Sequence, residues 1–152
     1  MTEDNDKKFL ELVAATGEEV DALLFILHKE KDILAKRDFS SLPEILNSKL
    51  QSADRIELFE KDLQGAANNN IADYIQEKGN DLGITEKWHE LQKKIEKCKA
   101  LNLANKKITD ANQNEIERLL AVLTGKNSSK QETYSASGSK SNSSFGNVIT
   151  KA

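Results

Sequence analysis

Apolar residues return every three or four positions along most of this chain, and no other feature restricts its fold as strongly. The first stripe lies between about Asp4 and Arg37, and residues at these steps share one face of an α-helix. It comprises Phe9, Val13, Thr16, Val20, Leu23, Leu27 and Leu34. Leu12, Leu24 and Ile33 widen the stripe. We therefore expect a long helix here that faces two neighbouring helices.

A second stripe follows a predicted break at residues 38–40. Ser41 and Glu44 have the spacing of a capping box, and Pro43 falls in the first helical turn, where its missing N–H costs little. The stripe comprises Leu42, Ile45, Leu46, Ala53, Ile56, Phe59 and Leu63. These features predict a second helix over about residues 42–64.

The connection over residues 65–84 begins with a glycine and soon reaches a run of three asparagines, residues that break helices. We expect it to hold one short helix around Ile71 to Glu77. Thr85 is then the predicted cap of a third and longest helix, which runs to about Thr124.

The apolar seam of this third helix contains a polar interruption. Trp88, Leu91, Ile95 and Cys98 come first, then Asn102, Asn105, Thr109 and Asn112, then Ile116, Leu119 and Leu123. A rival stripe of Leu101, Ala104, Ile108 and Ala111 lies one residue away, to which the packed face could shift. The sequence leaves both registers open.

Composition supports an all-α fold of elongated shape. Apolar residues make up 38% and charged residues 31% of the chain, with one proline and seven glycines. Long helices that each bury a narrow stripe produce such values. We expect an antiparallel three-helix bundle or coiled coil over residues 1–124. Residues 125–152 are rich in serine and lysine, and we expect them to form a flexible tail.

Charge and cysteine content narrow the classes of function. The net charge is −3, and the tail carries four lysines against one glutamate, so the body is acidic. Nucleic-acid binding needs clustered basic residues and is not expected. The single Cys98 excludes an internal disulfide and suits a reducing compartment. A polar N-terminus and the lack of a long apolar run predict a cytoplasmic protein without membrane insertion.

No catalytic constellation is visible. His28 and His89 are the only histidines, and neither belongs to a pair with metal-ligand spacing. Cys98 occupies a stripe position, as a buried structural thiol does. A glycine-rich phosphate loop is missing as well. We therefore expect a binding protein with no catalytic residues, no metal and no cofactor.

Three short motifs of this chain resemble motifs that occur together in one known protein family. Arg37-Asp38 with Leu42, Lys49 and Arg55 follows the pattern of the family's turn and second helix. Asn102-Leu103-Ala104-Asn105 with Ile108 is similar to the asparagine motif of its last helix, although Lys106 stands where the family often has glycine. Tyr134 and Gly138 keep the two ends of a further motif, without its aspartate and arginine.

Together the three motifs resemble the FlgN family of flagellar export chaperones, and this resemblance implies a function. Such chaperones bind the hook-filament junction proteins FlgK and FlgL, cover their aggregation-prone terminal helices and deliver them to the flagellar type III secretion apparatus. It also implies that Tyr134 docks on cytoplasmic components of the export gate, since an isolated aromatic residue in a polar tail contributes little to a core.

Helix lengths place the expected partner surface. At ~1.5 Å per residue, the second helix is roughly 36 Å long and the third roughly 58 Å, so residues 110–124 should project beyond their neighbours. The expected partner-binding residues are Asn102, Asn105, Ile108, Asn112, Ile116, Leu119, Leu120, Val122 and Leu123. Three other outcomes stay open: the helices slide to cover this end, the 65–84 connection folds over it, or it dimerises.

Two other classes of function remain. A structural coiled-coil subunit of a secretion apparatus would have an unbroken apolar seam, which the interruption at residues 102–112 disfavours. A helical enzyme or toxin would need convergent titratable groups, which the sequence does not display.

Overall fold

The computed structural model describes residues 2–79 and 81–125, which form five α-helices and two short 3-10 helices without any strand. The predicted all-α class is therefore confirmed. The expected tail and Tyr134 lie outside the described residues. None of the described helices is long and apolar enough to cross a membrane.

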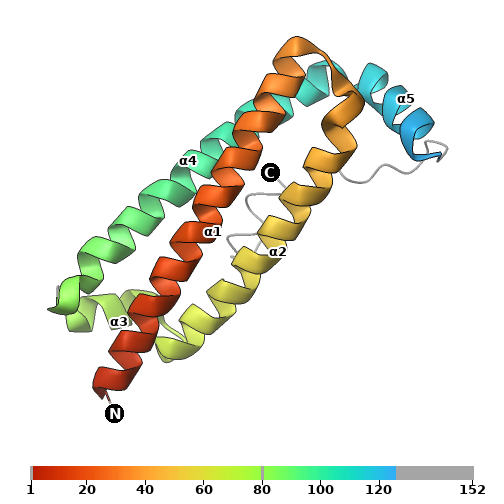
Figure 1. Cartoon of the computed structure of the whole chain (residues 1–152). Helices are drawn as coiled ribbons and strands as arrows, with labels where there is room; N and C mark the ends of the chain where they lie inside the picture. The colour runs from red at the N-terminus through yellow and green to blue at the C-terminus, as the bar shows by residue number, and fades with distance from the viewer. Residues whose placement is uncertain (1, 80, 126–152) are drawn as a thin grey trace.

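Three long helices lie side by side in an elongated body: α1 (Thr2–Lys36), α2 (Leu42–Ala66) and α4 (Ile84–Ala111) (Figure 1). α1 is packed along both α2 and α4, whereas α2 and α4 approach each other closely at few points. The wide stripe of α1 explains this arrangement, because Leu12 and Leu24 both pack against the core on either side of the buried line. The prediction that this helix faces two neighbours is confirmed.

The turn from α1 to α2 contains the 3-10 helix η1 (Phe39–Ser41), and Phe39 is buried there. Ser41 stands at the start of α2 but makes no side-chain cap, so the predicted capping box is wrong. The physical reason is that η1 runs directly into α2, so the Ser41 backbone is helical (φ −91°, ψ −2°), whereas a capping residue typically has an extended backbone. Pro43 occupies the first turn as expected.

The connection between α2 and α4 closes the end of the body that holds the N-terminus (Figure 1). It holds α3 (Ile71–Lys78), which confirms the predicted short helix, and η2 (Asp81–Gly83). The Asn70 side chain caps α3 by accepting from the Asp73 N–H at 3.0 Å. From α3, buried Tyr74 donates a hydrogen bond to Asp6 of α1. This bond fixes α3 against the start of α1.

The cap predicted at Thr85 is also wrong. α4 begins at Ile84 and follows Gly83, whose backbone is left-handed at φ +71°. Thr85 already lies inside the helix, and its hydroxyl donates to the Gly79 carbonyl instead. Glycine tolerates this conformation at little cost, so the chain turns into α4 without a side-chain cap.

The longest predicted helix is broken. α4 ends at Ala111, and after Asn112 a separate helix, α5 (Gln113–Thr124), turns away from the α4 axis (Figure 1). Asn112 has a non-helical backbone, and its side-chain amide donates to the Ile108 carbonyl at 2.9 Å. Asparagine ends helices readily because its side chain competes for backbone partners. The predicted plan of three helices is therefore incomplete, and α5 does not project in line beyond its neighbours.

Two separate apolar clusters fill the interior. The main cluster joins α1, α2, α3 and α4 and includes Phe9, Leu23, Leu27, Ile56, Leu63, Trp88 and Ile95. The second, here called the tip cluster, lies at the α5 end and consists of Leu34, Phe39, Leu42, Leu46, Ile116 and Leu120. A band of buried polar residues lies between them along the bundle.

Candidate partner-binding site

The tip cluster brings together side chains from α1, η1, α2 and α5. Ile116 and Leu120 of α5 are only 1% and 6% exposed, and Leu119 is half-buried beside them. The expectation that this apolar group stands uncovered is wrong for Ile116 and Leu120. The bend at Asn112 is the cause, because it lays α5 back onto the end of the bundle.

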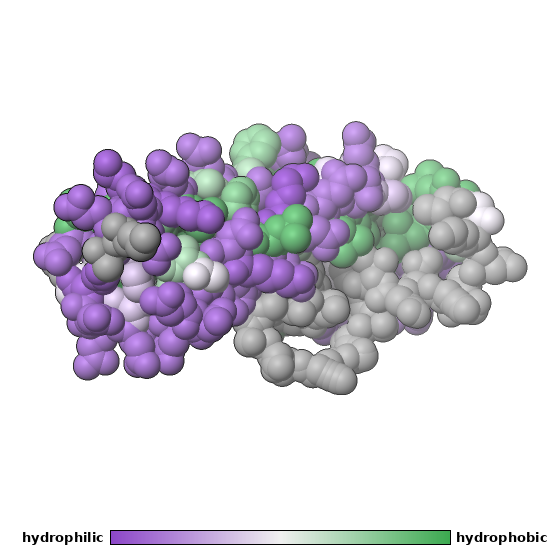
Figure 2. All heavy atoms as spheres, turned by 90° about the horizontal axis from the view of Figure 1, so that it is seen from below, coloured by the Kyte–Doolittle hydropathy of each residue, from purple (hydrophilic) through white to green (hydrophobic). Residues whose placement is uncertain are grey.

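The last turn of α5 keeps apolar residues in solvent. Val122 is 77% exposed and Leu123 is 47% exposed. Figure 2 shows a face that is mainly hydrophilic toward the end with α3, while hydrophobic residues gather toward the α5 end. Apolar surface beside an apolar cluster is typical of an interaction site.

Arg37 links the end of α1 to the junction of α4 and α5. Its guanidinium donates to the Asn112 side-chain oxygen at 2.6 Å and forms an ion pair with Glu115. It also lies over the Phe39 ring, 5.8 Å from the ring centroid. Both charged side chains of the ion pair are about half exposed. An exposed pair of this kind stabilises by only about 0–1 kcal/mol.

The polar interruption of the α4 seam points inward. Asn102, Asn105 and Thr109 are all buried, whereas Ala104 and Ala111 of the rival stripe are exposed. The packed face therefore keeps its register through the asparagines. Thr109 lies one turn beyond Asn105 and donates to the Asn105 carbonyl at 3.0 Å.

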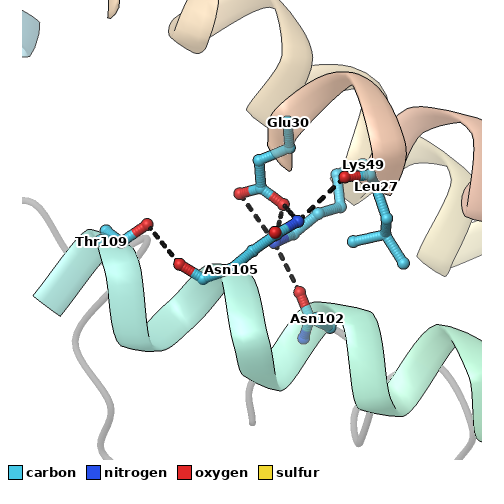
Figure 3. A network of polar contacts seen from close by, with 6 residues as sticks. All are labelled: Leu27, Glu30, Lys49, Asn102, Asn105 and Thr109. Carbon is cyan, nitrogen blue, oxygen red and sulfur yellow. Dashed lines mark hydrogen bonds and ion pairs between the residues drawn. The ribbon is translucent and has the colours of Figure 1, made fainter. Parts of the chain in front are cut away.

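A charged pair on the facing helices explains why the seam turns polar (Figure 3). Glu30 of α1 and Lys49 of α2 form a buried ion pair with an N–O distance of 3.2 Å. Lys49 also donates to the Asn102 side-chain oxygen at 2.8 Å, and the Asn105 amide donates to Glu30 at 3.0 Å and to the Leu27 carbonyl at 2.9 Å. Buried charges are tolerated only when paired and hydrogen-bonded in this way.

Glu30, Lys49, Asn102 and Asn105, here called the polar layer, separate the main cluster from the tip cluster. Within the described residues the side-chain oxygen of Asn105 is buried without a hydrogen-bond partner. Of the expected partner-binding residues, Asn102 and Asn105 thus lie inside the bundle, and Asn112 lies at the α4–α5 junction. Ile108 is half-buried and packs against the tip cluster.

The remaining reactive groups are placed for structure. Burial raises the pKa of the Cys98 thiol to about 12, with a further contribution from Asp21, and the thiol contacts the Val20 carbonyl oxygen. Burial and the Asp6 hydrogen bond raise the pKa of the Tyr74 hydroxyl. His28 and His89 are exposed. Among residues 2–79 and 81–125, histidine, cysteine and carboxylate side chains form no group that could hold a metal ion.

One comparison with known proteins gives a match. A family model described as FlgN protein matches residues 1–142, a range that contains all five helices of the structure. No curated protein and no solved structure matches the chain.

Proposed function

Because the chain belongs to the FlgN family of flagellar export chaperones, we propose that it binds the terminal helices of the hook-filament junction proteins FlgK and FlgL. In the cytoplasm it shields these helices from premature aggregation. It then delivers the junction proteins to the flagellar type III export apparatus. The clients are thus proteins rather than small molecules, and the chaperone needs no cofactor of its own.

The apolar surface at the α5 end is the observation that supports this proposal. Val122 and Leu123 are exposed beside half-buried Leu119, and the tip cluster lies directly beneath. An amphipathic helix binds such a surface through its apolar face. If the client segment is disordered beforehand, ordering on binding lowers its affinity, which permits later release.

The proposed client surface runs from the distal half of α4 onto α5. Ile108, Leu119, Val122 and Leu123 supply its accessible apolar part, and Ile116 and Leu120 support it from the tip cluster. Asn102 and Asn105 contribute from inside by fixing α4 to α1 and α2. Asn112 contributes by setting the direction of α5.

Substitution of the exposed residues tests this surface. We expect the double variant Val122→Asp and Leu123→Asp to bind a terminal-helix peptide of FlgK at least tenfold more weakly, because each buried aliphatic side chain contributes about 1.5–3 kcal/mol. The melting temperature should stay unchanged, since both side chains are exposed in the free chain. Calorimetric titration and thermal unfolding measure the two quantities.

Leu58→Asp is the matched control, because Leu58 is 61% exposed on α2 and lies in neither apolar cluster. It should leave FlgK binding unchanged. Equal weakening by the control and the double variant would show that binding depends on general surface hydrophobicity, and the proposed site would be lost. Tight FlgK binding by the double variant would also rule out the proposed site.

We assign docking on the cytoplasmic export gate to Tyr134. Tyr134→Ala should weaken binding of the chaperone to the purified cytoplasmic domain of the gate and reduce export of FlgK. Tyr134→Phe keeps the ring and should retain most of the binding, since a ring supplies most of the apolar contact area. FlgK binding by either variant should equal that of the unaltered chain. A fall in melting temperature of several degrees for Tyr134→Ala would instead give this residue a structural role.

A further inference from the structure

α5 is attached to the body through few groups. It packs on η1 and the end of α4, whereas α1 has extensive contacts with both α2 and α4. Of the α5 side chains over residues 113–123, only those of Ile116 and Leu120 are buried. The backbone is non-helical at Asn112, and the Asn112 side chain does not cap α5. These features mark the α4–α5 junction as a hinge.

Arg37 holds α5 in its closed position from the other side of the junction. The Arg37 guanidinium contacts Asn112 at the hinge and Glu115 in the first turn of α5. All of these contacts are on the surface, where water competes for each of them. Opening of α5 therefore replaces the Arg37 contacts by hydration, and it also exposes the buried side chains of Ile116 and Leu120.

The surface beneath α5 is apolar and structurally independent of the main cluster. Its members on the body are Leu34, Phe39, Leu42 and Leu46. The polar layer, held by the Glu30–Lys49 ion pair, lies between them and the main cluster. Opening of α5 thus uncovers the tip cluster while the interior of the bundle stays packed.

The inner and outer residues of α5 indicate what this surface accepts. α5 itself is an amphipathic helix seated there through Ile116 and Leu120, so a helix with apolar residues four positions apart fits the tip. Val122 and Leu123 add apolar surface that the tip leaves uncovered. If α5 served only to cover the tip cluster, exposed apolar residues at its end would not stabilise the chain.

We propose that α5 is a hinged arm that opens about Asn112, admits an amphipathic helix of the client onto the tip cluster and then closes on it. The client helix contacts Leu34, Phe39, Leu42 and Leu46 on one side and the apolar face of α5 on the other. The inference rests on the proposed function, because the client is the terminal helix of an exported subunit. The Arg37 contacts set how often the arm is open.

Hydrogen exchange in the free, full-length chain tests the hinge without any client. Backbone amides of residues 117–123 should exchange much faster than those around Leu27 in α1, because α5 opens locally. Arg37→Gln should accelerate exchange in α5 about threefold to tenfold, since it removes an exposed ion pair. Exchange in α1 should stay unchanged.

Two further variants separate the Arg37 contacts from general effects. The double variant Arg37→Glu with Glu115→Arg recreates an ion pair of opposite polarity and should restore slow exchange in α5. Lys94→Gln removes the exposed Lys94–Asp21 pair, which joins α4 to α1 far from the tip, and should leave α5 unaffected. Exchange of α5 in step with α1 in the unaltered chain would overturn the hinge.

Affinity for a synthetic terminal-helix peptide of FlgK tests the client part. Arg37→Gln should bind it about threefold to tenfold more tightly, because a larger fraction of the chain is open. Adding Val122→Asp and Leu123→Asp should weaken binding at least tenfold relative to Arg37→Gln alone. Unchanged or weaker binding by Arg37→Gln would overturn the arm and leave the proposed function intact. If the unaltered chain does not bind the peptide, the proposed function and the client part of the arm are both overturned. The hydrogen-exchange data then test only the hinge.

Discussion

Glu30 and Lys49 determine the chemistry of the middle of the bundle. Glu30 falls on the same face of α1 as Leu27 and Leu34, and the apolar stripe of the sequence skips its position. Glu30, which fills that gap in the α1 stripe, and the asparagines of α4 belong to the same polar layer. The gap in the α1 stripe and the asparagines of α4 are both visible in the sequence. Their distance in space is not, so the buried ion pair could not be predicted. The ion pair of Arg37 could not be predicted either, because its partner Glu115 is far along the chain.

A double-mutant cycle tests the polar layer at the level of single residues. Lys49→Met should lower the free energy of unfolding by about 3–5 kcal/mol, because it removes the ammonium group that pairs with the buried Glu30 carboxylate. Adding Glu30→Gln removes that charge and should recover at least about 1 kcal/mol. Urea unfolding of the single and double variants measures these differences. A double variant less stable than Lys49→Met would show that the charge of Glu30 has other partners of comparable strength.

At the scale of helices, the apolar periodicity predicted the long helices but not their caps or the break between α4 and α5. The stripes located α1, α2 and the start of α4 to within a few residues, because burial of one face dictates that spacing. The predicted end at Thr124 lies well beyond the end of α4 at Ala111. Caps were less predictable: Ser41 and Thr85 have suitable side chains, yet the Ser41 backbone is already helical and α4 starts one residue before Thr85. The break at Asn112 was missed because the three- and four-residue spacing of the seam continues through the polar positions to Ile116.

The independence of the two apolar clusters gives a prediction about α5. Leu120→Ala should accelerate hydrogen exchange within α5 and change the free energy of global unfolding by less than about 1 kcal/mol, since α5 opens before the rest unfolds. Leu27→Ala removes a fully buried side chain of the main cluster and should cost about 2–5 kcal/mol globally. Equal global costs for the two variants would mean that the clusters unfold as one unit.

Across the whole molecule, α1 is the helix on which the others assemble. α2 and α4 both pack along it, and α3 is tied to its start by Tyr74 and by a Lys78–Asp6 ion pair. The width of the apolar stripe of α1 predicts this central position. The position of α5 could not be foretold, because arithmetic on helix lengths assumes a straight third helix. Bending at one residue moved its apolar face from solvent onto the tip.

Limited proteolysis compares the parts of the whole molecule. Trypsin should cut at Arg118 in α5 well before it cuts at Lys93, Lys94 or Lys97 in α4, because cleavage requires local unfolding and α5 opens most easily. Mass spectrometry of early fragments identifies the first cuts. Early cleavage within residues 86–110 would contradict a stably packed α4.

The order of the helices along the chain has a consequence for biosynthesis. α1, η1 and α2 are adjacent in sequence and joined by a short turn, so they pair early at little cost in loop closure. The apolar residues Leu34, Phe39, Leu42 and Leu46 are therefore assembled long before α5 emerges from the ribosome. Each newly made molecule passes through a stage in which α5 does not yet cover the tip cluster. The same apolar surface that suits a client helix is thus exposed to every other nascent chain nearby until the last described helix has been translated.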